Sequence, residues 1–269
     1  MRELTRPSRL AEWAAELHGT PSDQLPEVLA LGDGDVTALF VSLSARCPDG
    51  RDAEYLKWHT LDHRAEQHRL QGLRGSMRFV STPECRSARA AADSRYEATD
   101  HVMVYLFAGQ APMDAFYGLG EELFKAGRMQ HRLPAVEGDL YLLRGKTAAP
   151  SAVAGADVLP WRPARGLYLL LELGVAAPDP LVEIDGVAGV WMAAADPDEI
   201  EARPWFGSVT SAAEGVKQVS LCFIDGDPID VAKRIEPVLG ERWAEGLVKP
   251  LLAAPFHTVV PYEWDRHLP

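Results

Sequence analysis

The order of apolar and polar positions along the chain predicts a mixed protein of helices and short strands. Strands are expected where apolar residues alternate or run without interruption, and helices where they recur every three or four positions. The predicted strands cover residues 37–45, 76–82, 101–108, 139–144, 166–175, 187–194, 218–224 and 256–262. The predicted helices cover 53–70 and begin again at 112 and 228, with a further helical piece around 241–248. The first half therefore has the order βαββαβ.

The helix predicted at 53–70 carries the most distinctive polar residues. Asp52 is the expected N-cap and Gly72 the residue that ends the helix. The expected core stripe of this helix consists of Trp58, Leu61 and Ala65. His59 and His63 are one turn apart, so they share a second face together with Glu66.

The second half of the chain matches the elements that follow this helix. Three points match at a nearly constant spacing: Gly72 with Gly186, Val102 with Val219, and Tyr141 with Thr258. The connection 176–185 is too short for a helix of several turns, so the histidine helix has no full counterpart. The alternative is two unrelated α+β domains. The expected organisation is a helical arm at 1–35, a first repeat at 36–150 and a second at 151–269, with 147–165 as the linker.

Two βαββαβ units in tandem resemble the dimeric α+β-barrel (ferredoxin-like) superfamily. The segment 55–80 is similar to its EthD-like and stress-responsive members through Trp58, Asp62, His63, Gly72 and the pair Arg78-Phe79. The proline common after that histidine is absent. The resemblance implies an α+β fold in which two four-stranded antiparallel sheets pack face to face as an intrachain pseudo-dimeric barrel. Members include monooxygenases, decarboxylases, isomerases, cyclases, haem-handling enzymes and proteins without known activity, so fold does not fix function.

Charge and composition narrow the range of partners. The formal net charge of −12 argues against nucleic-acid binding, which needs a basic face. No apolar run approaches the ~20 residues that span a bilayer, and the N-terminus has no apolar signal region. Three widely spaced cysteines, Cys47, Cys85 and Cys222, fit reduced thiols. We therefore expect a cytoplasmic protein, a monomer or homodimer, that binds neither nucleic acid nor membrane.

The histidine pair is the first candidate for chemistry. An imidazole titrates near neutral pH, so His63, with His59 beside it, is a candidate proton shuttle. Ordinary hydrogen bonding of a half-exposed histidine, to Asp62 for example, is the structural alternative. Two histidines without a third placed ligand do not make a zinc site, and no metal site is predicted.

Glu172 is the second candidate, because it interrupts a very apolar strand on the face shared with Tyr168. If that face lines the barrel interior, Glu172 is a buried carboxylate with a raised pKa and a candidate catalytic acid or base. The alternatives are a salt bridge to a strand neighbour such as Arg78, or a position near the strand end that reaches water. The residues expected to bind substrate are Arg78, Tyr105, Tyr168 and Trp191.

Three hypotheses for function follow. The first is a cofactor-free enzyme that performs proton transfer or oxygenation on a small hydrophobic, oxygenated molecule bound between the two sheets. The second is a non-catalytic binding or structural protein of the same fold. The third is a haem-linked enzyme, although the chain has no C-x-x-C-H attachment motif. No phosphate-binding loop, dinucleotide fingerprint or serine-nucleophile motif is present.

Overall fold

The computed structural model describes residues 36–109, 112–129, 131–174, 179–195 and 216–269. The predicted N-terminal arm, residues 1–35, lies outside the described residues. The strands are β1 (Ala38–Ser44), β2 (Leu73–Val80), β3 (Ala91–Ala92), β4 (His101–Phe107), β5 (Ala135–Ala148), β6 (Gly166–Gly174), β7 (Val187–Ala195), β8 (Lys217–Ile224) and β9 (Val248–Thr258). The α-helices are α2 (Asp52–Trp58), α3 (Arg64–Gln67), α4 (Pro83–Ser87), α5 (Pro112–Lys125) and α7 (Pro228–Ala244).

Short helices of other kinds complete the described chain. The π-helix η3 (His59–His63) lies between α2 and α3. The 3₁₀ helices are η4 (Pro150–Ala152), η5 (Ala156–Trp161) and η6 (Asp179–Glu183). None of the helices in the described part of the chain is long and apolar enough to cross a membrane.

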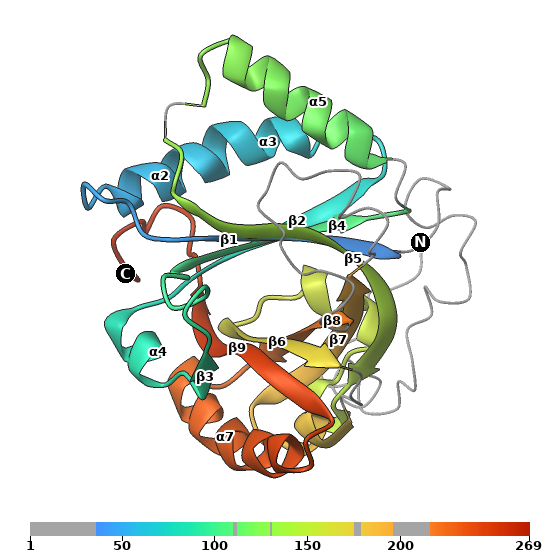
Figure 1. Cartoon of the computed structure of the whole chain (residues 1–269). Coiled ribbons are helices and arrows are strands. Elements are labelled where there is room, and N and C mark those ends of the chain that lie inside the picture. The colour runs from blue at the N-terminus through green and yellow to red at the C-terminus, as the bar shows by residue number, and fades with distance from the viewer. Residues whose placement is uncertain (1–35, 110–111, 130, 175–178, 196–215) are drawn as a thin grey trace, which may run out of the picture.

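The strands form one antiparallel sheet that closes on itself. Their order is β2-β4-β1-β5-β7-β8-β6-β9-β3, and β2 also pairs with β9 through Phe79 and Val80. We call β2-β4-β1-β5 the first-half sheet and β7-β8-β6-β9 the second-half sheet. In chain order both place their strands as second, third, first and fourth. The chain therefore has a mixed, α+β barrel-like architecture (Figure 1).

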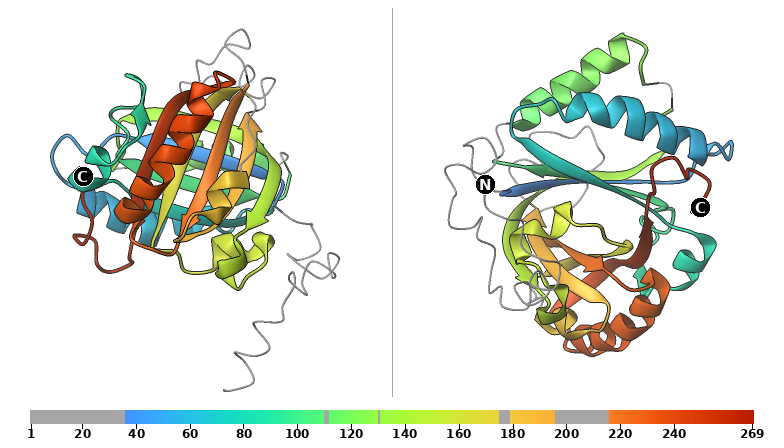
Figure 2. Two further views of the ribbon diagram at one scale, coloured as in Figure 1. Left: turned by 90° about the horizontal axis from the view of Figure 1, so that it is seen from below. Right: turned by 180° about the vertical axis from the view of Figure 1, so that it is seen from behind.

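Each sheet is covered on its outer face by helices. Figures 1 and 2 show α2, α3 and α5 over the first-half sheet and α7 over the second-half sheet. Alternation along β1 explains this arrangement: Leu39 and Val41 join the core between the sheets, whereas Phe40 packs toward α5 against Phe116. The strands of the first half are apolar on both faces for this reason.

A buried charged cluster joins the two halves inside the barrel. Lys217 of β8 donates to Glu137 (2.7 Å) and to Asp139 of β5. Tyr96 also donates to Glu137, at 2.6 Å. All four side chains are buried. Sequence reasoning missed this cluster because Lys217 lies 80 residues from Glu137 and 78 residues from Asp139 along the chain.

Several boundaries differ from the prediction. The helical piece expected around 241–248 is confirmed only for 241–244, which form the end of α7. It is wrong beyond Ala244, because Gly246 turns with a φ of 71° and Val248 already begins β9. The linker expected at 147–165 is instead the end of β5 followed by η4 and η5. Asp52 begins α2 and is not its N-cap; its carboxylate accepts from the Cys47 amide at 2.8 Å.

The connection between β6 and β7 agrees with the expectation of a missing helix within its described residues. From 179 onward it contains only η6 before β7 begins at Val187.

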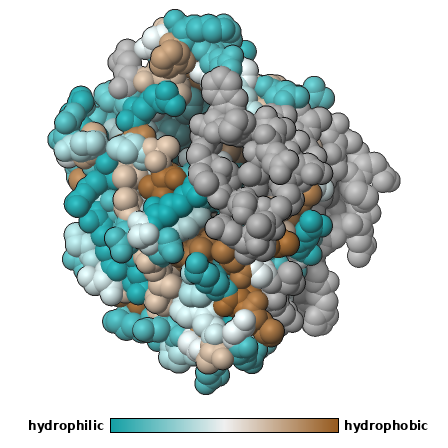
Figure 3. Space-filling view, viewed as in Figure 1, coloured by the Kyte–Doolittle hydropathy of each residue, from teal (hydrophilic) through white to brown (hydrophobic). Residues whose placement is uncertain are grey.

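On the face in Figure 3, hydrophilic and hydrophobic residues are interspersed over the described surface.

Candidate functional site

A pocket of about 870 Å³ lies between the outer face of the first-half sheet and its covering helices. We call it the helix pocket. Its polar lining includes His59, His63, Gln67, Arg78 and Tyr105. Its apolar lining includes Phe40, Tyr55, Trp58, Met103, Phe116 and Phe124. The cavity expected between the two sheets is thus not where these residues meet.

The π-helix η3 turns both histidines toward the sheet. The Arg64 amide bonds to the His59 carbonyl, five residues back, which is the π-helical pattern. His59 and His63 are buried, whereas Leu61 is 44% exposed and Ala65 is exposed as well. The predicted core stripe is therefore wrong at Leu61 and Ala65, whereas Trp58 is half-buried and lines the pocket, and the face with His59 and His63 points inward. π-Helical turns occur frequently at functional sites.

Both histidines are neutral at physiological pH. Burial lowers the pKa of His63 to about 4, and the charges of Arg78, Arg128 and Arg132 add to this against the opposing effect of Asp62. Burial likewise lowers the pKa of His59 well below its ordinary value, with the Arg78 charge as the next cause. The two ring centroids are 5.2 Å apart. The helix pocket thus contains two uncharged imidazoles, which can accept protons.

A short hydrogen-bond chain fixes the state of His59. The Tyr105 hydroxyl donates to the Gln67 side-chain oxygen at 2.5 Å, so its single proton is engaged there. The contact of 3.4 Å between that hydroxyl and His59 Nε2 is then a bond in which the imidazole donates. Nδ1 of His59 is left as the basic nitrogen, and it has no hydrogen-bond partner among the described residues.

Arg78 supplies a buried positive charge at the same site. Its guanidinium lies 4.6 Å from the centre of the Tyr55 ring and contacts His101 Nδ1 at 3.4 Å. His101 in turn contacts Asp52 through Nε2 at 2.7 Å. In the described part of the chain Arg78 forms no ion pair with a carboxylate, and its Nε has no partner. A buried cation without an acid beside it favours binding of an anionic group.

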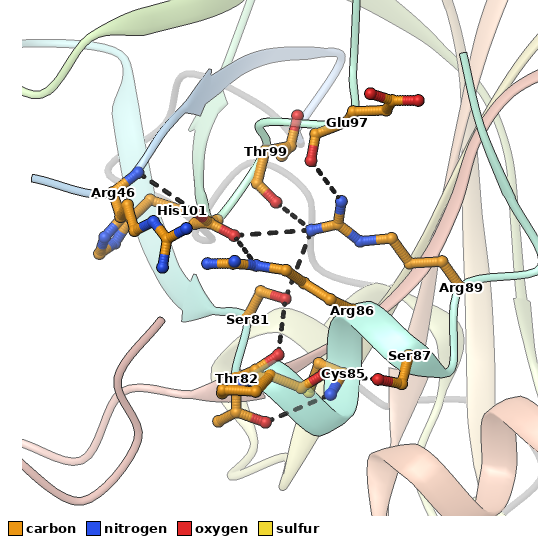
Figure 4. A network of polar contacts seen from close by, with 12 residues as sticks. Arg46, Ser81, Thr82, Cys85, Arg86, Ser87, Arg89, Glu97, Thr99 and His101 are labelled. Atoms are coloured by element: carbon orange, nitrogen blue, oxygen red, sulfur yellow. Dashed lines mark hydrogen bonds and ion pairs between the residues drawn. The ribbon is translucent and has the colours of Figure 1, made fainter. Parts of the chain in front are cut away.

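His101 is held in place by a network around Asp100. Arg86 donates to Asp100 through Nε at 2.7 Å, and Arg89 lies 3.7 Å from the same carboxylate oxygen. Arg89 also donates to the carbonyl groups of Glu97 and Thr99 (Figure 4). The start of β4 is thereby tied to α4, which fixes the backbone that carries His101.

The structure places Glu172 and Tyr168 away from the helix pocket. Their shared face lies on the outside of the second-half sheet, against α7, and does not line the barrel interior as expected. Glu172 accepts from Trp243 at 2.7 Å and from Arg242. Burial is the main cause that raises the pKa of Glu172, against the lowering effects of these two partners. Glu172 thus forms an ion pair, as the alternative expected, but its partner is Arg242 of α7 and not a strand neighbour such as Arg78.

Trp191 is also distant from the helix pocket. It points into the barrel, where its ring nitrogen donates to the Ala156 carbonyl at 2.8 Å and its ring lies 4.8 Å from the Lys146 ammonium. Of the predicted site residues, His59, His63, Arg78 and Tyr105 come together, and Glu172, Tyr168 and Trp191 do not.

Gln67 and Phe116 are pocket residues that sequence reasoning missed. Gln67 continues the spacing of four from His59 and His63, so extension of that face by one turn would have found it. Phe116 lies on α5, and an apolar residue on a helix gives no sign from the sequence alone that it borders a cavity. Among the described residues, no group of three His, Cys, Asp or Glu side chains is placed to hold a metal ion.

The helix pocket and the closed sheet define an α+β barrel-like protein with a buried polar site. No family model and no curated protein sequence matches the chain. A candidate monooxygenase from Fusobacterium nucleatum is 10% identical, with a TM-score of 0.45 over 84% of this chain and 94% of that one. A candidate chlorite dismutase is 12% identical, with a TM-score of 0.49 over 84% of this chain and 96% of that one. A variant of DypB from Rhodococcus jostii, in complex with heme, is 8% identical, with a TM-score of 0.47 over 87% of this chain and 96% of that one.

Proposed function

We propose that the helix pocket binds a small hydrophobic molecule with an acidic oxygen or an acidic carbon beside a carbonyl, and removes its proton. The acceptor is one of the neutral imidazoles, His63 or His59. Arg78 binds the oxygen on which negative charge develops. The single observation that carries this proposal is the placement of two uncharged buried histidines beside a buried arginine that has no acid partner among the described residues.

The chemistry follows from the charges of these groups. The proton moves to an imidazole nitrogen, and the electron pair stays on the substrate as a phenolate or enolate. Charge-assisted hydrogen bonds to an oxyanion are stronger than neutral ones, so Arg78 stabilises the product of this step more than the substrate. Tyr105 and Gln67 hold His59 in the tautomer that accepts at Nδ1. An enolate can then be reprotonated at another atom or react with O₂, which requires no cofactor from the protein.

The matched pair 1-naphthol and 1-methoxynaphthalene tests this assignment by calorimetry. The naphthol should bind more tightly, since only it can give up a proton. Arg78→Gln should remove about 1.5–3 kcal/mol from naphthol binding, the usual contribution of a hydrogen bond to a charged group. Tyr168→Phe is the control outside the helix pocket and should bind like the parent. Equal affinity for both probes, or an unchanged Arg78→Gln variant, would reject the proposal.

Two alternatives give different results in the same variants. A non-catalytic binding protein would bind 1-naphthol in its protonated form, which the absorption spectrum of the bound probe detects because the naphtholate absorbs at longer wavelength. A haem-linked function is favoured by the unpartnered Nδ1 atoms of His59 and His63 within the described structure, because a neutral imidazole can ligate iron. A haem titration followed by absorption would show ligation, and loss of the spectral shift in His63→Ala and His59→Ala would identify the ligand.

We also propose that the chain is a tandem pair of ferredoxin-like βαββαβ repeats of the EthD-like type, divided at 36–150 and 151–269. The matching strand orders of the two half sheets support this proposal. A monomeric or homodimeric state in the cytoplasm is part of the same proposal, and sedimentation and cell fractionation test it.

A further inference from the structure

A second cavity, of about 730 Å³, lies where β2 meets β9. We call it the seam cavity. Its apolar lining includes Met77, Phe79, Leu159 and Phe223. The C-terminal segment after β9 contributes Val259, Val260, Pro261, Arg266 and His267. Of its lining residues only Arg78 also lines the helix pocket, so the two cavities are separate sites that share one side chain.

Positive charge gathers at the seam cavity in a chain of net charge −12. Its positively charged lining comprises Arg64, Arg78, Arg162, Arg165 and Arg266. Asp227 is the one acidic residue among the described lining. The Asp227 carboxylate caps α7 by accepting from the amides of Ile229 (3.0 Å) and Asp230 (3.1 Å). Asp225 pairs with Arg162 and Glu263 pairs with Arg266 at 2.8 Å. Arg64, Arg78 and Arg165 are the lining arginines that have no carboxylate partner among the described residues.

Several of these guanidinium groups retain free donors. Among the described residues no carboxylate pairs with Arg64, which is half-buried, and burial lowers its pKa together with the charge of Arg78. Arg162 bonds to Asp225 through Nη2 at 2.5 Å, while its buried Nη1 has no partner in the described structure. Arg78, buried and without an acid partner there, has an unpartnered Nε. Buried donors without acceptors cost free energy that an anion would recover.

We propose that the seam cavity binds a small organic anion, with a carboxylate or phosphate headgroup on an apolar, preferably aromatic, body. Arg162 is positioned by Asp225 and offers its second nitrogen to the headgroup, with Arg64 and Arg78 adding positive charge. The rings of His257 and His267 stack in parallel with centroids 4.0 Å apart and provide a flat wall for an aromatic body. The site shares Arg78 with the helix pocket, but anion binding at the seam cavity does not require proton transfer in the helix pocket.

Phenyl phosphate is the probe, measured by calorimetry on the full chain at fixed ionic strength. Inorganic phosphate lacks the apolar body, benzyl alcohol lacks the charge, and phenylacetate carries the other headgroup. We expect phenyl phosphate or phenylacetate to bind at one site, and the two incomplete probes to bind at least about tenfold more weakly. Whichever of the two complete probes binds more tightly identifies the headgroup.

Variants separate this site from the helix pocket. Arg162→Gln should weaken binding about tenfold or more, as expected for a lost charge-assisted bond. Arg69→Gln removes an arginine that is 81% exposed and outside both cavities, so its affinity should equal the parent's. His63→Gln should also bind the probe normally, even if the proton-transfer proposal fails.

The proposal is overturned if neither complete probe binds, if inorganic phosphate or benzyl alcohol binds as tightly as the better complete probe, or if Arg162→Gln binds like the parent. Because Arg162 pairs with Asp225, the substitution can destabilise the fold, so the midpoint of thermal unfolding of the Arg162→Gln variant is measured in parallel. If Arg162→Gln fails to fold, Arg165→Gln, an exposed lining position, replaces it and should weaken binding at least severalfold. Equal affinity of Arg165→Gln and the parent would then contradict the proposal.

Discussion

His63 shows how burial determines the chemistry of a single residue. Its ring stacks on Trp58 with centroids 5.2 Å apart and lies under the influence of the Arg78 charge. Removal from water and a nearby cation both disfavour the imidazolium. His63 therefore has an unprotonated nitrogen at neutral pH, and an anion that forms beside it would offset the charge of the proton that it receives.

The pH dependence of stability tests this state. The unfolded chain protonates His63 near pH 6.5, but the folded chain does so only near pH 4, so the unfolded state binds more protons between these values. The lowered pKa of His63 should therefore cost no unfolding free energy above about pH 6.5, and the free energy of unfolding should fall as the pH is lowered toward 4. His63→Gln should reduce that loss by roughly 3 kcal/mol at pH 4, measured by urea denaturation. An identical pH profile for parent and variant would refute the depressed pKa.

Glu172 is expected to serve stability, because Arg242 and Trp243 occupy its carboxylate. Breaking a buried ion pair leaves an uncompensated charge, so Glu172→Gln should cost about 3–5 kcal/mol of unfolding free energy. Binding of 1-naphthol should not change. Glu122→Gln, at an exposed ion pair, is the control and should cost less than about 1 kcal/mol. Unchanged stability with lost ligand binding would instead support the catalytic role.

The sequence identified His59, His63 and Arg78 because their residue types carry chemistry and two of them share a helix face. It could not identify the partner of Glu172, since Arg242 lies 70 residues away and reaches it only through the packing of α7. Residue type predicts that a buried carboxylate needs compensation, but only the tertiary structure shows what supplies it.

The helix formed by α2, η3 and α3 is unusual in directing its polar face inward. Apolar spacing predicted Leu61 and Ala65 as core, and both are exposed. The periodicity rule assumes that the inner face of a helix packs against apolar residues. Here that face borders a pocket to which His59, His63 and Gln67 contribute polar groups, so the rule selects the wrong side of the helix.

Two leucines of this helix test its orientation. Leu61 is 44% exposed and Leu56 is 1% exposed. Leu61→Ala should cost less than about 1 kcal/mol, whereas Leu56→Ala should cost about 2–5 kcal/mol because it leaves a cavity. Chemical denaturation measures both. A larger cost at Leu61 than at Leu56 would mean that the helix is rotated and that His59 and His63 face solvent.

On the scale of the whole molecule, the two halves share one closed sheet. β5 pairs with β7 along seven residue pairs from Tyr141–Ala195 to Ala148–Gly189, and β2 pairs with β9 on the other side. The buried Lys217 of the second half is compensated by Glu137 and Asp139 of the first. Strand positions were predictable because the strands are apolar on both faces, but closure depends on distant pairings that local patterns do not specify.

Separate expression of residues 1–150 and 151–269 tests this closure. Each piece exposes sheet edges and leaves one side of the Lys217 cluster unpaired, so neither should fold cooperatively as a soluble monomer. Mixing the two pieces should restore a cooperative thermal transition. Two independently folded, monomeric halves would contradict the single closed sheet.

The helix pocket itself is tested most directly by a pH titration of bound 4-nitrophenol, whose phenolate absorbs at longer wavelength than the phenol. If Arg78 stabilises an oxyanion there, the pKa of the bound probe should lie about one unit or more below that of the free probe. Arg78→Gln should abolish this shift, and Tyr168→Phe should retain it. A bound probe with an unchanged or raised pKa would contradict the proposal that this pocket stabilises a deprotonated ligand.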